Sequence, residues 1–199
     1  MTVLLVLATF IVFLTIDWFY SRKRAPAPVL QFETAPAVQQ RPEVVGGFQL
    51  PEALRYHFGH TWASAEGPQT VRVGLDDLAA RFIGKATRLT LPKRGQWIRQ
   101  GQKVWSIERD GRTIEMVSPI EGMITDVNEM AVADPQLPLR DPYGQGWLLA
   151  VHSPDARTNF RNLLSGAVAR KWLEEAAERL RGAVPALAGA YAQDGGLMV

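Results

Sequence analysis

Short segments of alternating apolar and polar residues, punctuated by glycine and proline, run from Phe48 to His152 and constrain the fold more than any other feature. Alternation points one row of side chains toward a core and the other toward solvent, as in a half-buried strand. The expected strands are 69–73, 86–91, 103–108, 112–117, 123–127 and 147–151. Between the first two, apolar residues at helical spacing predict a short helix: Leu75, Leu78, Phe82 and Ile83. Short strands with little helix predict a mainly β domain over 48–152, built as a small sandwich or barrel.

Two helices are expected after this domain, over 153–182. Ser153-Pro154 is typical of a helix start, because serine caps free N–H groups and proline fits the first turn, so the first helix is expected over 155–164. The second, 167–181, is expected to bury one apolar stripe: Val168, Trp172, Ala176 and Leu180. The tail 183–199 has no period and is expected to be irregular.

The chain opens on an apolar run from Val3 to Ile16, interrupted only by two threonines. As a helix, residues 3–20 would rise about 27 Å, close to the hydrocarbon thickness of a bilayer. The aromatic and cationic residues that would follow at the headgroups are Trp18, Tyr20, Arg22, Lys23 and Arg24. The sequence therefore predicts a single-pass transmembrane anchor over 1–24 in the cytoplasmic (inner) membrane, with the C-terminal bulk on the cytoplasmic side. Residues 25–47, rich in proline, are expected to form a spacer.

Composition excludes several classes of chemistry. The chain has no cysteine, which removes disulfides, thiol nucleophiles and thiolate metal sites. A net charge of +2 does not indicate nucleic-acid binding. His57 and His60 lie three residues apart but have no further ligand nearby, so no metal site is expected, and Asp76-Asp77 is expected to cap the short helix. No catalytic constellation is present, and the chain is expected not to be an enzyme and to need no cofactor or small-molecule substrate.

Several motifs of this sequence resemble those of a known family and occur in the same order. Those of the middle segment are Leu91–Gly95, Gly101–Val104 and Ser118–Asn128, and those that flank it are His60–Trp62, Glu66-Gly67, Val71–Ala79 and Asp141–Leu148. Together they resemble the glycine cleavage system H protein, over roughly residues 55–175. The resemblance implies a lipoyl-type barrel-sandwich hybrid domain with packed C-terminal helices, in which His60 and Trp62 pack the barrel. It also implies a carrier that shuttles an aminomethyl group on a lipoylated lysine at a hairpin tip.

The lysine that the family needs is missing from this sequence. In the family it lies between a Val-Glu pair and a Ser-Pro pair, which here correspond to Ile107-Glu108 and Ser118-Pro119. Counting between them puts Gly111 at the lysine position, and no lysine occurs from Val104 to Leu164. Lipoate attaches to a primary amine, which the guanidinium of Arg112 does not provide. The segment instead carries Asp110-Gly111, the pair that a tight type I′ turn prefers.

We therefore predict a non-catalytic, non-lipoylated accessory or scaffold subunit of a larger integral membrane complex, such as a respiratory or photosynthetic electron-transfer assembly. Its partners would be integral membrane subunits and the lipid bilayer. The expected partner contacts are the charged tip residues and two large aromatic residues: Arg109, Asp110, Arg112, Trp97 and Trp105. The alternatives for these residues are simple solvation of the tip and packing of the tryptophans in the core.

Two other functions remain open from the sequence. One is a genuine lipoyl carrier of a membrane-tethered glycine-cleavage-type system, with the group attached elsewhere, at Lys103 or Lys93. The other is a membrane-fusion adaptor, which also joins a membrane helix to a barrel-sandwich domain. That class would need a long helical hairpin within the barrel, and no heptad run supplies one.

Overall fold

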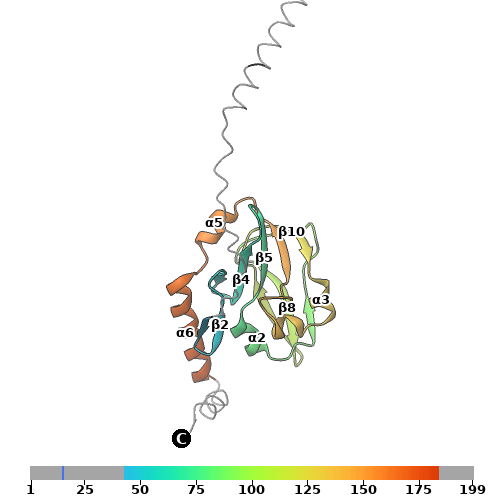
Figure 1. The fold of residues 1–199 in the computed structure, drawn as a ribbon. Coiled ribbons are helices and arrows are strands. Elements are labelled where there is room, and N and C mark those ends of the chain that lie inside the picture. Colours follow the sequence, from blue (N-terminus) through green and yellow to red (C-terminus); the bar gives the residue numbers. More distant parts are fainter. Residues whose placement is uncertain (1–14, 16–42, 184–199) are drawn as a thin grey trace, which may run out of the picture. The chain divides into compact units, whose positions relative to one another are not determined.

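The computed structural model describes residue 15 and residues 43–183 (Figure 1). Its strands are β1 Glu43–Val45, β2 Phe48–Leu50, β3 Arg55–His57, β4 Thr61–Ala65, β5 Thr70–Leu75, β6 Arg88–Thr90, β7 Trp97–Ile98, β8 Lys103–Arg109, β9 Arg112–Val117, β10 Gly122–Val127 and β11 Leu149–His152. Its helices are α2 Asp77–Ile83, α3 Glu129–Ala133, α4 Leu137–Arg140, α5 Ala156–Arg161 and α6 Gly166–Ala183. The fold is mainly β with some helices, as the sequence predicts.

The main core lies between two antiparallel sheets. The larger sheet has the order β3-β4-β5-β11-β10-β7, and the smaller has the order β6-β8-β9. Val73, Val151 and Ile124 from the larger sheet and Leu89 and Ile107 from the smaller one belong to the same buried cluster. Alternation within each strand thus places one apolar row between the sheets, which is the physical basis of the predicted β domain.

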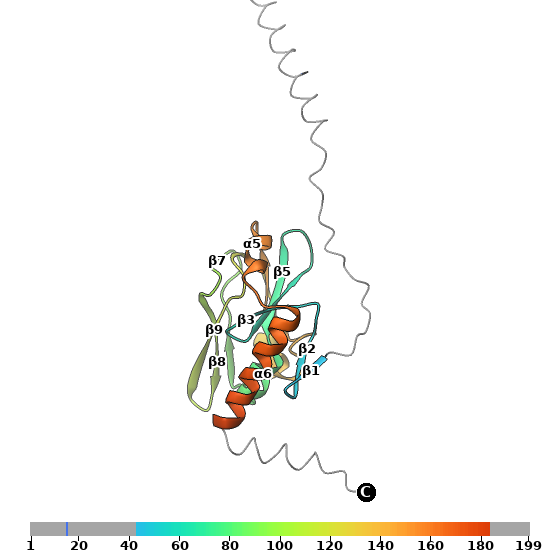
Figure 2. The ribbon, with the colours of Figure 1, turned by 90° about the vertical axis from the view of Figure 1, so that its left-hand side faces the viewer.

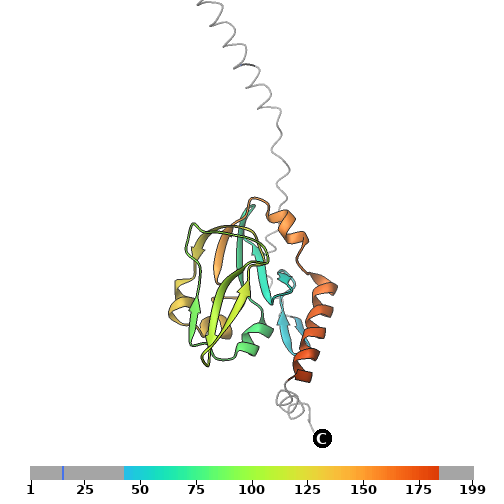
Figure 3. The ribbon, with the colours of Figure 1, turned by 180° about the vertical axis from the view of Figure 1, so that it is seen from behind.

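A second core lies under α6, on the other face of the larger sheet. Figures 2 and 3 show α6 along one side of the β domain, with the β1–β2 hairpin beside it. Tyr56 and Trp62 from β3 and β4 pack here with Leu173 and Ala177 of α6 and with Phe48 of β2. Around β4, the larger sheet is therefore covered on both faces.

The β1–β2 hairpin is held to α6 and α2 by polar contacts as well as by packing. The Arg170 guanidinium on α6 contacts Glu43 Oε2 at 2.6 Å and Glu52 Oε1 at 2.5 Å. The Gln49 N–H donates to Asp77 Oδ2 at 2.8 Å, and the Tyr143 hydroxyl donates to the Gln49 carbonyl at 2.8 Å. Burial raises the pKa of Tyr143, which keeps that hydroxyl protonated as a donor.

The predicted elements and the observed ones differ in several places, and strands β2, β3, β4 and β7 match none of the predicted strands. Glu43–Val45, at the end of the predicted spacer, forms β1. The segment 128–141, which carries no strong period, forms α3 and α4, with the Asn128 side chain capping α3. The stripe predicted to be buried on the last helix is displaced by one position, because α6 buries Ala169, Leu173 and Ala177 while Val168 is 63% exposed.

The predicted anchor and spacer residues 1–14 and 16–42 lie outside the described residues, as does the tail 184–199. The anchor residues Trp18, Tyr20, Arg22, Lys23 and Arg24 are among them. Within residue 15 and residues 43–183, no helix is long and apolar enough to span a membrane.

Candidate functional site

The tip of the β8–β9 hairpin is the place where the sequence and the family resemblance put the functional residue. Arg109 and Arg112 are the last paired residues of the two strands, and Asp110 and Gly111 join them. Asp110 has φ 48° and Gly111 has φ 73°, and positive values at both central residues are what a type I′ turn requires. The structure thus has the tight Asp-Gly turn that the sequence predicts.

The tip is fastened to the C-terminal end of α2. The Arg109 guanidinium donates from Nη1 to the Phe82 carbonyl at 2.6 Å and lies 3.3 Å from Asp110 Oδ2 through Nε. The Phe82 carbonyl belongs to the last turn of α2, where unpaired carbonyls favour a cation. Beside it, the Thr87 N–H and hydroxyl both donate to the Glu108 carbonyl, at 2.8 and 3.0 Å. These contacts hold the end of β8 next to the turn.

An apolar ring and a free cation lie at the tip. Phe82, one of the apolar residues whose spacing predicts α2, is 49% exposed next to the Arg109 contact. Arg112 is exposed and makes no ion pair with any described residue. An exposed aromatic ring beside a guanidinium is the kind of surface that protein partners bury. The apolar pattern of α2 does not indicate that Phe82 is a surface residue, because its spacing is the same as that of a buried residue.

Gly111 lies in open space. A Cβ atom built on this residue would have no heavy atom within 4 Å, so a side chain here would point away from the domain. The position is therefore accessible, as an attachment point would have to be, but glycine offers no nucleophilic atom.

The two lysines considered as alternative attachment points for lipoate lie away from the hairpin tip. Lys103 begins β8 at the open end of the hairpin, and its Nζ contacts Glu115 Oε2 at 2.5 Å. Lys93 is exposed in the loop between β6 and β7 and lines a shallow depression of about 410 Å³ with Leu91 and Val132. Neither residue is at the turn between β8 and β9.

The two tryptophans proposed as partner contacts are placed differently. Trp97 on β7 is 50% exposed and pairs across the strands with Met123, which is 41% exposed. Trp105 on β8 is 3% exposed and belongs to the main core. Of the two, only Trp97 is available to a partner.

His60 and Asp76 join the β3–β4 turn to the start of α2. Asp76 caps α2 as predicted, since its Oδ1 accepts from the Ala79 N–H at 2.7 Å. Its other oxygen, Oδ2, lies 2.8 Å from His60 Nδ1. His57 Nδ1 instead accepts from the Gly59 N–H at 3.0 Å, and burial lowers the pKa of His57. Among residue 15 and residues 43–183, no group of three potential metal ligands comes together.

Comparison with known proteins finds glycine cleavage system H proteins among the relatives. A glycine cleavage system H protein of Mycobacterium avium is 36% identical over 107 residues, covering 54% of this chain and 81% of that protein. One from Gloeobacter violaceus is 37% identical and covers 54% and 82%. A probable glycine cleavage system H protein 2 of Saccharolobus solfataricus is 31% identical and covers 66% and 92%. The crystal structure of the H protein from Mycobacterium marinum aligns with a TM-score of 0.49 and 29% identity, covering 53% of this chain and 87% of that one.

These relatives correct one prediction and establish the family. The comparisons contradict the predicted single-pass location in the inner membrane, because the relatives that they find are glycine cleavage system H proteins. A family model described as "Glycine cleavage H-protein" matches residues 54–176, which is more than half of the chain. The chain therefore belongs to the glycine cleavage H-protein family.

Proposed function

We propose that this chain is a non-lipoylated member of the glycine cleavage H-protein family, whose hairpin tip binds a partner protein instead of carrying an aminomethyl group. The observation that carries the proposal is Gly111 at the tip, in a left-handed turn with open space around it. The family resemblance puts the lipoyl-lysine at this position, and the residues present here do not fit that group.

Amide attachment of lipoate needs a primary amine that is free and exposed. No lysine occurs from Val104 to Leu164, and the Nζ of Lys103 is paired with Glu115 at the other end of the hairpin. The neighbouring Arg109 and Arg112 carry delocalised guanidinium groups, which are charged at all physiological pH values and are poor nucleophiles. The tip is therefore suited to contact and not to group transfer.

The tip has the features of a contact surface. Arg109 fixes it against α2, so that little conformational entropy remains to be lost when a partner binds. The exposed ring of Phe82 supplies apolar area, and Arg112 supplies an uncompensated positive charge. A partner with an apolar patch and a nearby carboxylate would match both.

Intact mass after co-expression with a lipoate ligase and lipoic acid tests the loss of the carrier function. We expect the full-length chain to stay unmodified and the Gly111→Lys variant to gain one lipoyl group, because the added side chain meets no neighbour, although the positive φ of this position strains the turn. Arg112→Lys is the matched control, since it places an amine one residue away on the same exposed turn. A lipoyl group on the unaltered chain, at Lys93 or Lys103, would contradict the proposal and restore the carrier function.

Site-directed crosslinking tests the contact surface. The chain has no cysteine, so Arg112→Cys provides a single attachment point for a photoreactive group. The control is Arg157→Cys on α5, which lies near the open end of the hairpin, where Gln100 Nε2 contacts the Asn159 carbonyl at 3.0 Å. We expect a defined adduct in the native host from the tip only. The integral membrane host predicted from the sequence stays a prediction that the identity of the adduct tests. Equal labelling from both sites would contradict a tip-specific partner.

A further inference from the structure

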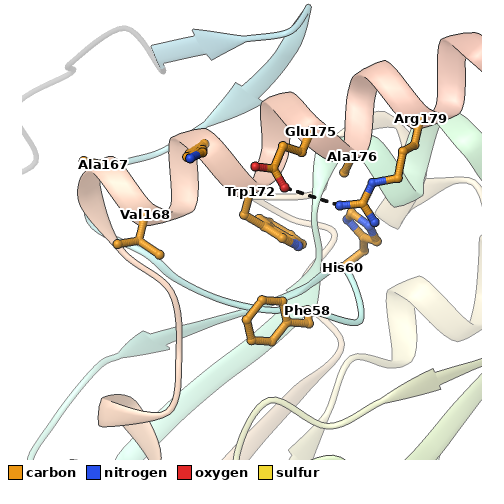
Figure 4. A pocket seen from close by; sticks show the side chains of 9 residues that line it. Phe58, His60, Ala167, Val168, Trp172, Glu175, Ala176 and Arg179 are labelled. Atoms are coloured by element: carbon orange, nitrogen blue, oxygen red, sulfur yellow. Dashed lines mark hydrogen bonds and ion pairs between the residues drawn. The ribbon is translucent and has the colours of Figure 1, made fainter.

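A groove lies between α6 and the turn that joins β3 to β4. It is an open groove of about 640 Å³, and the lining residues that matter here include Phe58, His60, Val168, Lys171, Trp172 and Glu175 (Figure 4). Val168, Trp172 and Ala176 belong to the apolar stripe that the sequence predicts to be buried. Because α6 turns the adjacent line Ala169, Leu173 and Ala177 to the domain, that stripe is only partly covered.

The apolar part of the groove is unusually exposed. Phe58 and Val168 are each 63% exposed, and Figure 4 shows Val168 beside the Trp172 ring and Phe58 below it. Phe58 meets Trp172 edge to face, with ring centroids 6.4 Å apart and an interplanar angle of 88°. Contiguous exposed apolar side chains around a ring are typical of an interaction site.

The floor of the groove is held in place by buried groups. His60 stacks on Trp172 with centroids 4.8 Å apart and an interplanar angle of 26°. Its backbone has φ 58°, an uncommon conformation for a residue with a side chain. The contact of Nδ1 with Asp76, which is 1% exposed, holds the ring in this position. The groove is thus preformed, which lowers the entropic cost of filling it.

The charged residues at the rim of the groove determine whether it favours an occupant of positive or negative charge. Arg179 lies 3.5 Å from Glu175, so these two charges compensate each other. Lys171 is exposed and makes no ion pair with a described residue, whereas its neighbour Arg170 points to Glu43 and Glu52. The rim therefore has one uncompensated positive charge, which disfavours a cationic occupant even though aromatic rings line the floor.

We propose that this groove binds a peptide segment of a partner protein in which an apolar side chain lies next to a carboxylate. The apolar side chain packs on Trp172 between Phe58 and Val168, and the carboxylate pairs with Lys171. This site uses none of the residues at the hairpin tip, and it does not depend on whether the chain carries a lipoyl group.

Selection from a phage-displayed library of random dodecapeptides on the immobilised full-length chain tests this inference. We expect the enriched peptides to share an aliphatic or aromatic residue beside Asp or Glu. Synthetic copies of them should bind Phe58→Ala and Lys171→Glu at least about tenfold more weakly, the loss that follows from removing about 1.4 kcal/mol of contact. The matched controls are Met130→Ala, another exposed apolar residue, and Lys85→Glu, another exposed lysine; both should bind as the unaltered chain does. Circular dichroism shows whether each variant keeps its fold.

Three results would overturn the proposal. The first is enrichment of basic peptides, or of peptides whose binding is unchanged in Phe58→Ala and Lys171→Glu. The second is concentration-dependent dimerisation that Phe58→Ala abolishes, since the occupant would then be a second copy of the chain. The third is tighter peptide binding after removal of residues 184–199, which would make that segment the occupant.

Discussion

The stability of the folded state depends on pH through His57. Its ring is half-buried, burial lowers its pKa from the ordinary value of 6.5, and its Nδ1 accepts from the Gly59 N–H at 3.0 Å. The unfolded chain therefore binds a proton at this residue more readily than the folded chain does. When the unfolded state binds more protons, the free energy of unfolding rises with pH and falls on acidification. The contribution of His57 is thus fully present above the unfolded pKa and is lost as the pH falls below it.

Urea unfolding at about pH 7.5 and about pH 5.5 measures this effect. We expect the midpoint of the unaltered chain to fall on acidification, and to fall less in His57→Gln, whose side chain does not titrate. The same loss of stability in both proteins would show that other groups cause the pH dependence.

The close approach of the Trp62 ring requires glycine at position 74. A Cβ atom on this residue would lie 2.6 Å from Trp62 Cζ2, and that ring is 2% exposed with its Nε1 bound to the Pro142 carbonyl at 3.0 Å. The ring has no room to move, so Gly74→Ala should lower the free energy of unfolding by about 1–3 kcal/mol. In the control, Gly182→Ala on α6, the added methyl meets nothing within 4 Å and should stabilise the helix by about 0.5–1 kcal/mol. Equal effects in urea unfolding would contradict this role for Trp62.

At the scale of single residues, turns and helix caps could be predicted from the sequence, whereas contacts between residues far apart in the chain could not. The turn at Asp110-Gly111 and the cap at Asp76 follow from the conformations and hydrogen bonds of the residues themselves. By contrast, the bond from Arg109 to the Phe82 carbonyl joins residues 27 positions apart. No pattern in either segment encodes it. The same limit explains why the burial of Trp105 was not predicted, because strand alternation defines two faces but does not say which face is covered.

At the scale of elements, the β1–β2 hairpin shows why its strands were missed. Three-residue strands are too short to display alternation, and the first of them lies in a proline-rich region. The hairpin is buried because α6 and α2 offer a surface for Phe48 and Leu50. Its stability is therefore a property of two elements far apart in sequence.

This dependence predicts unequal effects for two substitutions in the hairpin. Leu50 on β2 is 3% exposed, so Leu50→Ala should lower the free energy of unfolding by about 2–5 kcal/mol. Val44 on β1 is 64% exposed, and Val44→Ala should change it by less than about 0.5 kcal/mol. Urea unfolding followed by circular dichroism measures both. A small effect of Leu50→Ala would mean that the hairpin detaches from α6 at little cost.

The displaced stripe of α6 has a different cause. Helical spacing correctly predicted an amphipathic helix, but α6 carries two adjacent apolar lines, one through Val168 and Trp172 and one through Ala169 and Leu173. The sequence favours the line with the larger side chains. The structure buries the other line, in which two of the three residues are alanine. Alanine lets the helix backbone approach the hairpin, where Gly46 lies opposite Ala177.

At the scale of the described molecule, one strand joins the two cores. Consecutive residues of β4 face opposite sides of the larger sheet, so Trp62 packs in the core under α6 and Ala63 packs between the sheets. Neither core can lose its packing without disturbing the sheet that supports the other. The cores should therefore unfold together, as expected for a single domain of this size.

Substitutions in the two cores test this coupling. Leu173→Ala opens a cavity under α6, and Ile124→Ala opens one between the sheets; both side chains are 1% exposed. Each should lower the free energy of unfolding by about 2–5 kcal/mol. Urea unfolding followed by tryptophan fluorescence and by far-ultraviolet circular dichroism should give coincident transitions in both variants, with an unchanged denaturant slope, because both cores are exposed in one step. If Leu173→Ala separated the two transitions, α6 and the hairpin would form an independently melting unit, and the groove between α6 and the β3–β4 turn would open without loss of the β domain.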